Sequence, residues 1–386
     1  MLVYFQLLFK KFYKSKTNIF PLGFVFFLII SVLLLNMRAT SKTNFQTALK
    51  EDIRTNQELL TQYKEAYQKE PTNQDLPNVI QIVQNNLSLA ENSFAAFEQK
   101  NYSQAYEYNL EMNKQILETN EKAVSDEFLN ALNYQQLLLS KLKEQNIQIE
   151  TQSTPITAIA YSLSIVQFLF PIALSFVLCM LLANIFTNKY THGIDKSKLL
   201  PFSSKTIKKV ELLFAIVLSS CLFFSFYLVA FAVAGLVNGI GSWEYPTQTF
   251  SVDKNILATE TIQVVLFKSI ILQYLSTVFL VVFMYLLSIF IKEKLNLLFA
   301  SVAFLVAPSF VLPFIVPLRN SVHLIPNIYL SATNIATGQF AQITGNSHLN
   351  FSSGVIVNSL GIVFLLAIIF SDNRLKGTKR SSIKYC

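Results

Sequence analysis

The chain has 386 residues, of which 52% are hydrophobic and only 14% carry a charge. A soluble domain carries about 25% charged residues, so the composition argues against a soluble enzyme and against a disordered chain. The net charge of +8 does not by itself indicate a nucleic-acid partner, because basic residues in a membrane protein record which side a loop occupies. We therefore expect no nucleic acid among its partners.

Residues 1–17 predict a cytoplasmic amphipathic helix that lies in the lipid headgroup layer. The apolar side chains Phe5, Phe9 and Phe12 fall on one helical face, and Lys10 and Lys14 fall on another. Such a helix places its apolar face toward the acyl chains and its lysines on anionic phosphates. The alternative is a short extension of the first membrane span. Membrane lipids are therefore an expected partner.

Six apolar stretches approach the roughly 20 residues that a helix needs to cross a bilayer. No small-residue cleavage site follows the first stretch, so we expect a retained span over residues 18–37 and not a signal peptide. The six stretches are residues 19–37, 158–186, 210–237, 262–291, 295–316 and 355–370.

Residues 38–157 predict a helical domain, because apolar side chains recur there at helical spacing. The residues from Val79 to Phe97 step by three and four, and three further segments repeat the pattern. Pro71 and Pro77 are expected to separate the first helix from the second. Asn101 separates the second from the third, with Ser103 as the expected N-cap. Whether the domain contacts a substrate or partner, or only packs on itself or on a second copy, stays open.

Residues 188–209 predict an inner loop between the second and third spans. Gly193 and Pro201 bracket a short helix-capable piece, and leucine and phenylalanine side chains add an apolar knob among six lysines. Such a knob suits docking into a cleft on a soluble partner; the alternative is a solvated loop that only sets topology. The residues assigned to docking are His192, Gly193, Leu199, Leu200, Pro201 and Phe202.

The basic residues orient the chain. The N-terminal segment, the inner loop, the turn after the fourth span and the tail at residues 372–386 together hold 17 Lys+Arg, and six spans place all four on one side. Residues 38–157 hold 11 Lys+Arg against 16 Asp+Glu and fall on the other. Basic loops face the cytoplasm, which predicts a cell membrane protein with both termini cytoplasmic and an extracellular domain. The expected fold class is an all-α polytopic membrane protein, with spans two to six within residues 158–371.

The sequence offers little for catalysis. It contains no phosphate-binding G-x-x-x-x-G-K-[ST] loop and no metal-ligand spacing among its three histidines. We expect no enzyme activity, no metal and no cofactor in this chain. Lys268 and Glu211 are expected to reach toward a membrane interface, and Gln167 and Gln273 to hydrogen-bond between helices.

Three segments resemble the type-2 permeases of ATP-binding-cassette exporters. Residues 2–16 look like the family's interfacial elbow helix. Residues 185–204 look like its inner loop and coupling helix, although Asn188 and Lys189 stand where the family has an acidic residue. Pro326, Tyr329 and Gly338 look like the segment before the last span, where short helices dip back toward the membrane from outside.

By this resemblance, the chain would be the permease subunit of an exporter in a bacterial-type cell membrane. Separate ATPase subunits would bind ATP and Mg²⁺ and dock on the inner loops. A second permease copy, identical or paralogous, would complete the pathway, and the cargo would be hydrophobic, amphipathic or peptide-like. Two alternatives stay open: a membrane-anchored sensor that binds a partner through its extracellular helices, and a sodium-type ion-efflux permease.

Overall fold

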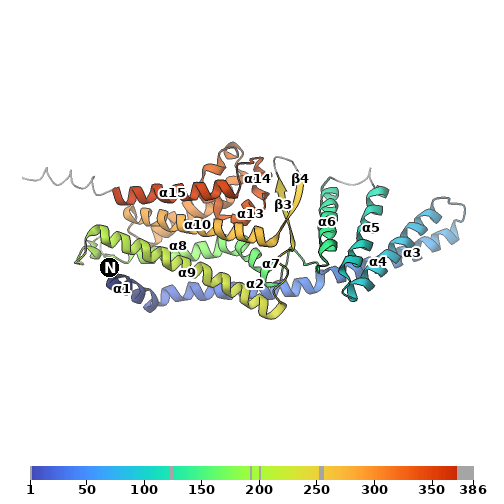
Figure 1. Ribbon diagram of the computed structural model, residues 1–386, viewed down its shortest axis with the longest axis horizontal. Coiled ribbons are helices and arrows are strands. Elements are labelled where there is room, and N and C mark those ends of the chain that lie inside the picture. The colour runs from blue at the N-terminus through green and yellow to red at the C-terminus, as the bar shows by residue number, and fades with distance from the viewer. Residues whose placement is uncertain (1, 121–125, 192–193, 200, 252–255, 372–386) are drawn as a thin grey trace, which may run out of the picture.

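The computed structural model describes residues 2–120, 126–191, 194–199, 201–251 and 256–371. Within these ranges, six helices are long and apolar enough to cross a membrane. Figure 1 shows α2, α9, α10 and α15 side by side along the long axis, with α3 to α6 beyond one end. The predicted class of a helical multi-pass membrane protein is confirmed at this level. The predicted tail at 372–386 lies outside the described residues.

The six predicted spans all form, some with a change of helix type. Two of them contain π-helical segments, which insert an extra residue per turn. Spans one, three, four and six are α2 (Lys16–Thr43), α9 (Ser204–Asn238), α10 (Ile262–Phe290) and α15 (Phe351–Ser371). Span two consists of α7 (Ala158–Ser164), η1 (Ile165–Leu174) and α8 (Ser175–Thr187). Span five consists of α11 (Lys294–Ser301), η3 (Val302–Val306), α12 (Ala307–Val311) and η4 (Leu312–Phe314).

Two apolar cores hold the bundle together. One joins α8, α9, α10, α11 and α15 around Phe186, Tyr285 and Leu297. The other joins α2, the second span and α9, where Phe170 packs edge-on against Phe223 at 5.3 Å between ring centroids. Close packing of such side chains fixes the relative positions of the spans.

Four helices form the helical insert between spans one and two. They are α3 (Phe45–Lys69), α4 (Leu76–Glu98), α5 (Tyr102–Asn120) and α6 (Asp126–Gln145). Each of these helices packs on the next along the chain. A single residue, Asn44, separates α2 from α3, and its side chain caps the N-terminus of α3. The expected helices and the break around Pro71 and Pro77 are confirmed.

The expected N-cap at Ser103 is wrong. The helix α5 begins one residue earlier, at Tyr102, and the Asn101 side chain accepts from the backbone N–H of Gln104 at 3.3 Å. An asparagine oxygen satisfies a free N–H of the first turn as well as a serine does. Ser103 instead gives its backbone N–H to Asn146 Oδ1 at 2.9 Å.

A β-hairpin that the sequence reading missed lies between the helical insert and the bundle (Figure 1). Strand β3 (Pro246–Ser251) pairs antiparallel with β4 (Ile256–Thr261), from Pro246 opposite Thr261 to Ser251 opposite Ile256. A second pair, β1 (Tyr190–Thr191) and β2 (Ile194–Asp195), lies in the inner loop. The strict all-α prediction is therefore corrected to a helical fold with two small hairpins.

Short helices form the N-terminal segment, part of the inner loop and the connection between spans five and six. The amphipathic segment forms α1 (Leu2–Lys14), and the inner loop contains η2 (Lys196–Leu199). Between spans five and six lie η5 (Val316–Leu318), η6 (Val322–Leu324), η7 (Pro326–Leu330), α13 (Ala332–Ala336) and α14 (Gln339–Thr344). The short helices expected around Pro326 and Tyr329 are confirmed. We call the end of the bundle beside α1 and the inner loop the basic end, and the opposite end the insert end.

Candidate functional site

The helix α1 lies against the basic end of the bundle. Phe5 packs edge-on against Phe214 of α9, with 5.3 Å between ring centroids, and Phe12 is half-buried against the core of span one. Lys10 and Lys14 are exposed, as predicted. Phe9 lies on the same helical face by its spacing, but 56% of its surface is exposed. Of the predicted apolar stripe, Phe5 and Phe12 therefore contact the bundle, and Phe9 lies largely on the surface.

A buried carboxylate at the basic end connects four segments. Glu211 of α9 is 4% exposed and pairs through Oε2 with Lys189 Nζ at 2.7 Å. Tyr4 of α1 donates to Glu211 Oε1 at 3.0 Å, and Tyr285 of α10 donates to Oε2 at 3.2 Å. A buried ion pair is stable only when its remaining hydrogen-bonding capacity is satisfied, and the two tyrosines meet that need.

The expectation that Glu211 reaches toward an interface is wrong. Its carboxylate turns into the protein because Lys189, from the start of the inner loop, and two phenols compensate it there. Burial, and next the Glu211 carboxylate, raise the pKa of Tyr4, so its hydroxyl keeps its proton and acts as the donor. We call Glu211, Lys189, Tyr4 and Tyr285 the basic-end junction.

The inner loop carries an exposed leucine and a half-buried phenylalanine. Leu199 ends η2 and is 81% exposed, as a protruding knob requires. Phe202 lies 6.3 Å from the ring of Tyr4 and joins the small core of Ile207 and Val210, so it does not protrude as expected. Pro201 is exposed, and Ser203 caps α9 by accepting from Thr206 N–H at 3.2 Å. The predicted docking residues His192, Gly193 and Leu200 lie outside the described residues.

These contacts make the loop and the spans one connected unit. Phe202 touches Tyr4, Tyr4 bonds Glu211, and Glu211 also holds Tyr285 of the fourth span. Asn184 of the second span donates to Asn18 Oδ1 of the first at 2.7 Å nearby. The inner loop is therefore connected to spans three and four through a continuous set of side-chain contacts.

At the insert end, the segment before the last span packs tightly. Pro326 begins η7, and the buried Tyr329 donates its hydroxyl to the His323 carbonyl at 2.6 Å. Gly338 has φ +75°, and a Cβ there would overlap the Phe250 carbonyl oxygen of β3. Only glycine adopts this backbone beside so close a neighbour without strain. The three predicted residues thus lie in one segment, with Gly338 against the hairpin.

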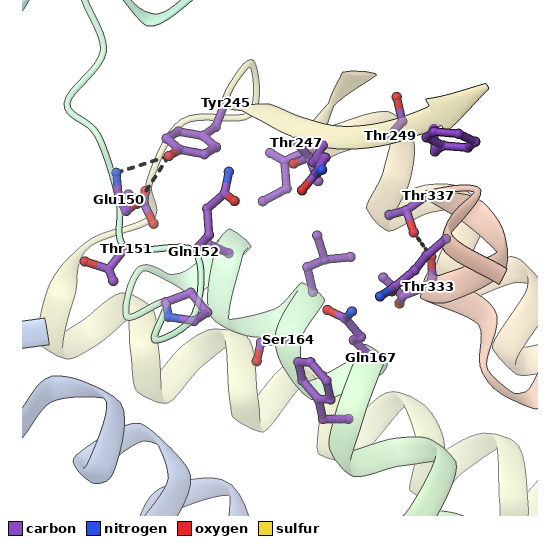
Figure 2. Close-up of a pocket in the computed structure, with 18 of the residues that line it drawn as sticks. Glu150, Thr151, Gln152, Ser164, Gln167, Tyr245, Thr247, Thr249, Thr333 and Thr337 are labelled. Atoms are coloured by element: carbon purple, nitrogen blue, oxygen red, sulfur yellow. Dashed lines mark hydrogen bonds between the residues drawn. The ribbon is translucent and has the colours of Figure 1, made fainter. Parts of the chain in front are cut away.

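A cavity of about 310 Å³ lies between this segment, β3, the second span and the residues that follow α6 (Figure 2). Figure 2 shows side chains converging on it from all four elements. Threonine and glutamine dominate the wall: Thr151, Thr247, Thr249, Thr333, Thr337, Gln152, Gln167, Gln248, Gln339 and Gln342. We call it the insert-end cavity.

Hydrogen bonds fix part of the cavity wall. Gln167 donates from Nε2 to Asn334 Oδ1 at 3.1 Å, which confirms the expected bond between helices. Tyr245 donates its hydroxyl to the Glu150 carbonyl at 3.1 Å and accepts from the Glu150 N–H at 3.2 Å. Burial raises the pKa of the Glu150 carboxyl, and the hydrogen bond from Thr157 partly offsets the shift.

Two other polar residues of the spans behave differently. Lys268 forms an ion pair with Glu260 of β4 at 2.7 Å and is partly exposed. Gln273 is fully buried in α10, and neither of its side-chain atoms has a partner among the described residues. The expected interhelical bond of Gln273 is therefore absent from the described part of the chain.

Among the described residues, no group of three or more His, Cys, Asp or Glu side chains is placed to hold a metal ion. Comparisons of the chain with protein-family models, with curated proteins and with solved structures gave no match. The geometry of the two ends therefore carries the functional argument.

Sequence reasoning missed the β3 side of the cavity. The run of alternating threonines at residues 247–249 and the β-branched residues at 256–261 are a strand signal. The strands lie in the connection between two long apolar helices, α9 and α10, whose stronger hydropathy signal dominates this part of the sequence. The Glu211 junction was missed for another reason: its partners lie 22, 74 and 207 residues away.

Proposed function

We propose that this chain is the transmembrane permease subunit of an ATP-driven exporter of the ATP-binding-cassette type-2 kind, powered by a separate ATPase subunit. The observation that carries the proposal is the basic-end junction, which joins an exposed loop to two spans through a buried ion pair. A protein that only anchors a domain needs neither six spans nor such a connection. The segments that resemble the family elbow helix and coupling loop meet at this junction.

In the proposed mechanism, the ATPase binds the inner loop around Leu199. Closure of two ATPase subunits on ATP would push the loop toward the bundle. Phe202 and Lys189 would transmit the push to α1, α9 and α10, because Phe202 packs against Tyr4 and Lys189 pairs with Glu211. The spans would then rock together and open the insert end.

The charge distribution supports the orientation that this mechanism needs. The inner loop and the N-terminal helix carry an excess of lysine, and the helical insert carries an excess of acid. Basic loops stay on the cytoplasmic side. We propose that the protein lies in the cell membrane with both termini in the cytoplasm and the helical insert outside.

The state of the charged groups in the spans favours an apolar or peptide-like cargo over an ion. Glu211 is engaged by Lys189 and Lys268 by Glu260. Ion-coupled pathways usually carry ionisable groups at membrane depth, whereas Glu211 and Lys268 lie near the ends of α9 and α10. A second permease copy, identical or related, is proposed to complete the pathway.

The test is co-purification and ATPase stimulation with Leu199→Asp. Leu199 is 81% exposed, so the change leaves the fold intact while placing a charge in the proposed docking knob. Tyr67→Asp is the matched control, because Tyr67 lies on α3 of the helical insert and is 38% exposed. We expect about a tenfold or greater loss of ATPase association for Leu199→Asp, as for an interface anchor, and no loss for Tyr67→Asp.

Equal association of both variants would refute the docking assignment. If no P-loop ATPase accompanies the wild-type chain and a partner binds α3 and α4 instead, the protein is a membrane-anchored binding protein. The Tyr67→Asp variant would then be the one that loses its partner. The two results are mutually exclusive, so one experiment separates the proposed functions.

A further inference from the structure

We infer that the insert-end cavity binds an extended, uncharged peptide, which pairs as an added strand with the free edge of β3. The inference deepens the proposed function and rests on it in one respect: it names a peptide as the cargo class that meets the protein at this end. The binding itself involves no ATPase. Peptide binding can therefore be tested separately from ATPase docking.

The first observation is the pairing pattern of the hairpin. Opposite residues of an antiparallel pair alternate between exchanging hydrogen bonds and pointing their backbone groups away. Phe250 gives its N–H to the Thr337 carbonyl at 2.8 Å and not to β4, so its backbone faces the outer edge. The register is unbroken from Pro246 to Ser251, which places the N–H and C=O of Gln248 on the same edge.

The second observation is that this edge opens onto the cavity. Four consecutive residues of β3, from Thr247 to Phe250, line the cavity wall. Side chains of consecutive strand residues point to opposite faces of a sheet. A cavity that touches all four lies beside the strand edge and not over one face. Among the described residues, nothing pairs with the backbone of Gln248, and this residue is exposed.

The third observation is that the protein already fills one position of the edge with its own backbone. Thr337 bonds Phe250, and Gly338 allows the two chains to approach closely. The segment then turns away into α14. A peptide in the cavity would continue this pairing at Gln248, two residues along the strand, as in strand-addition binding modes.

The fourth observation is the chemistry of the wall, which selects an uncharged chain. Amide and hydroxyl side chains surround the edge, and Glu150 is the single ionisable carboxyl among the described lining residues. Burial raises the pKa of that carboxyl, so the site disfavours charge. Thr333, 1% exposed, keeps a hydroxyl with no partner among the described residues, which leaves hydrogen-bonding capacity in the wall.

The size of the cavity matches a short stretch of backbone. Its volume of about 310 Å³ is at the lower end of the range for ligand pockets, about 300–1,000 Å³. Leu163, Phe168 and Ile262 add apolar wall that suits small or β-branched side chains. Charged side chains would lose hydration there without a partner.

The test uses the full-length protein in lipid nanodiscs and a fluorescent, end-capped peptide of alternating threonine and valine. Binding is measured by fluorescence anisotropy. The variant is Gln248→Pro, which removes the edge N–H but no bond to β4, and proline is tolerated at such edge positions. The control is Gln248→Ala, which removes the side chain and keeps the N–H. We expect Gln248→Pro to weaken binding about tenfold and Gln248→Ala to leave it nearly unchanged.

A second arm does not depend on how the proline variant folds. The same peptide with alternate backbone nitrogens methylated cannot pair with a strand edge, and wild-type protein should bind it at least about tenfold more weakly. Equal binding of methylated and unmethylated peptide would overturn the inference. Displacement by a neutral oligosaccharide but not by the unlabelled peptide would also overturn it, since the wall would then recognise hydroxyls.

Failure of this inference and failure of the proposed function are distinguishable. Leu199→Asp should bind the peptide as the wild type does. Leu199 lies three residues before Phe202, which packs against Tyr4 of α1, and Figure 1 shows α1 at the opposite end of the bundle from β3. Loss of peptide binding only in Gln248→Pro, with ATPase association refuted, would keep the peptide site and discard the exporter. Confirmed ATPase association, with equal peptide binding by wild type and Gln248→Pro, would support the exporter and refute the peptide site.

Discussion

The two ends of the bundle differ in how their buried polar groups are hydrogen-bonded. At the basic end, a full charge is buried and every oxygen of Glu211 has a partner. At the insert end, the polar groups are neutral and numerous, and Thr333 and the Gln248 edge stay free among the described residues. A satisfied network fixes one arrangement, whereas unsatisfied neutral groups beside a cavity leave room for a ligand. This difference supports the two proposals, force transmission at the first end and recognition at the second.

The largest loss of stability is expected from Glu211→Ala, which removes the central carboxylate of the basic-end junction. The change leaves Lys189 without its carboxylate in a site where its side chain is 15% exposed. Removing one partner of a buried ion pair destabilises a protein by about 3–5 kcal/mol. Because water can partly solvate Lys189, we expect a loss of about 3 kcal/mol in the free energy of unfolding. Thermal unfolding in nanodiscs measures it.

The double variant Glu211→Leu with Lys189→Met is the control for this prediction. Replacing a whole buried pair by apolar groups of similar volume is close to neutral, so most of the stability should return. A single variant as stable as the double one would mean that the pair is solvated and that the junction does not transmit force.

A smaller effect is expected from Gly338→Ala at the recognition end. The residue has φ +75°, and its new methyl group would meet the Phe250 carbonyl. A left-handed backbone costs a non-glycine residue about 1–2 kcal/mol, and the overlap adds strain. Hydrogen exchange at the Phe250 amide, which bonds Thr337, should accelerate, while amides near Glu211 should be unchanged.

Gly23→Ala is the matched control for the glycine change. Gly23 lies inside α2 with nothing within 4 Å of an added Cβ. An alanine in a helix is more stable than a glycine by about 1 kcal/mol. Equal acceleration of the Phe250 amide in both variants would show that Gly338 does not hold the hairpin.

The smallest effect concerns pH at Glu150. Its folded-state pKa is raised above the ordinary value of 4.5 by burial, so the folded state binds the proton more tightly than the unfolded state. Stability is therefore highest below that ordinary value and falls as pH rises toward the raised pKa. Relative to the wild type, Glu150→Gln should lose this contribution and gain stability at neutral pH. A difference between the two proteins that grows on acidification would contradict the assignment.

The long-period features of the fold were predictable, because they depend on composition averaged over many residues. Six spans, four insert helices and the amphipathic α1 follow from apolar spacing alone. The partners of Glu211 were not predictable, since Tyr4, Lys189 and Tyr285 meet it only after the spans pack. The free edge at Gln248 likewise depends on Thr337 binding Phe250, a contact between segments joined only through two spans.

The central claim is that the loop around Leu199 is the docking point of an ATPase. The most direct measurement places a photo-crosslinking amino acid at position 199 in the living cell, with position 67 as the comparison. The account predicts a crosslinked product with a P-loop ATPase from position 199 and none from position 67. An ATPase product from both positions, or from neither while position 67 captures a different partner, would contradict it.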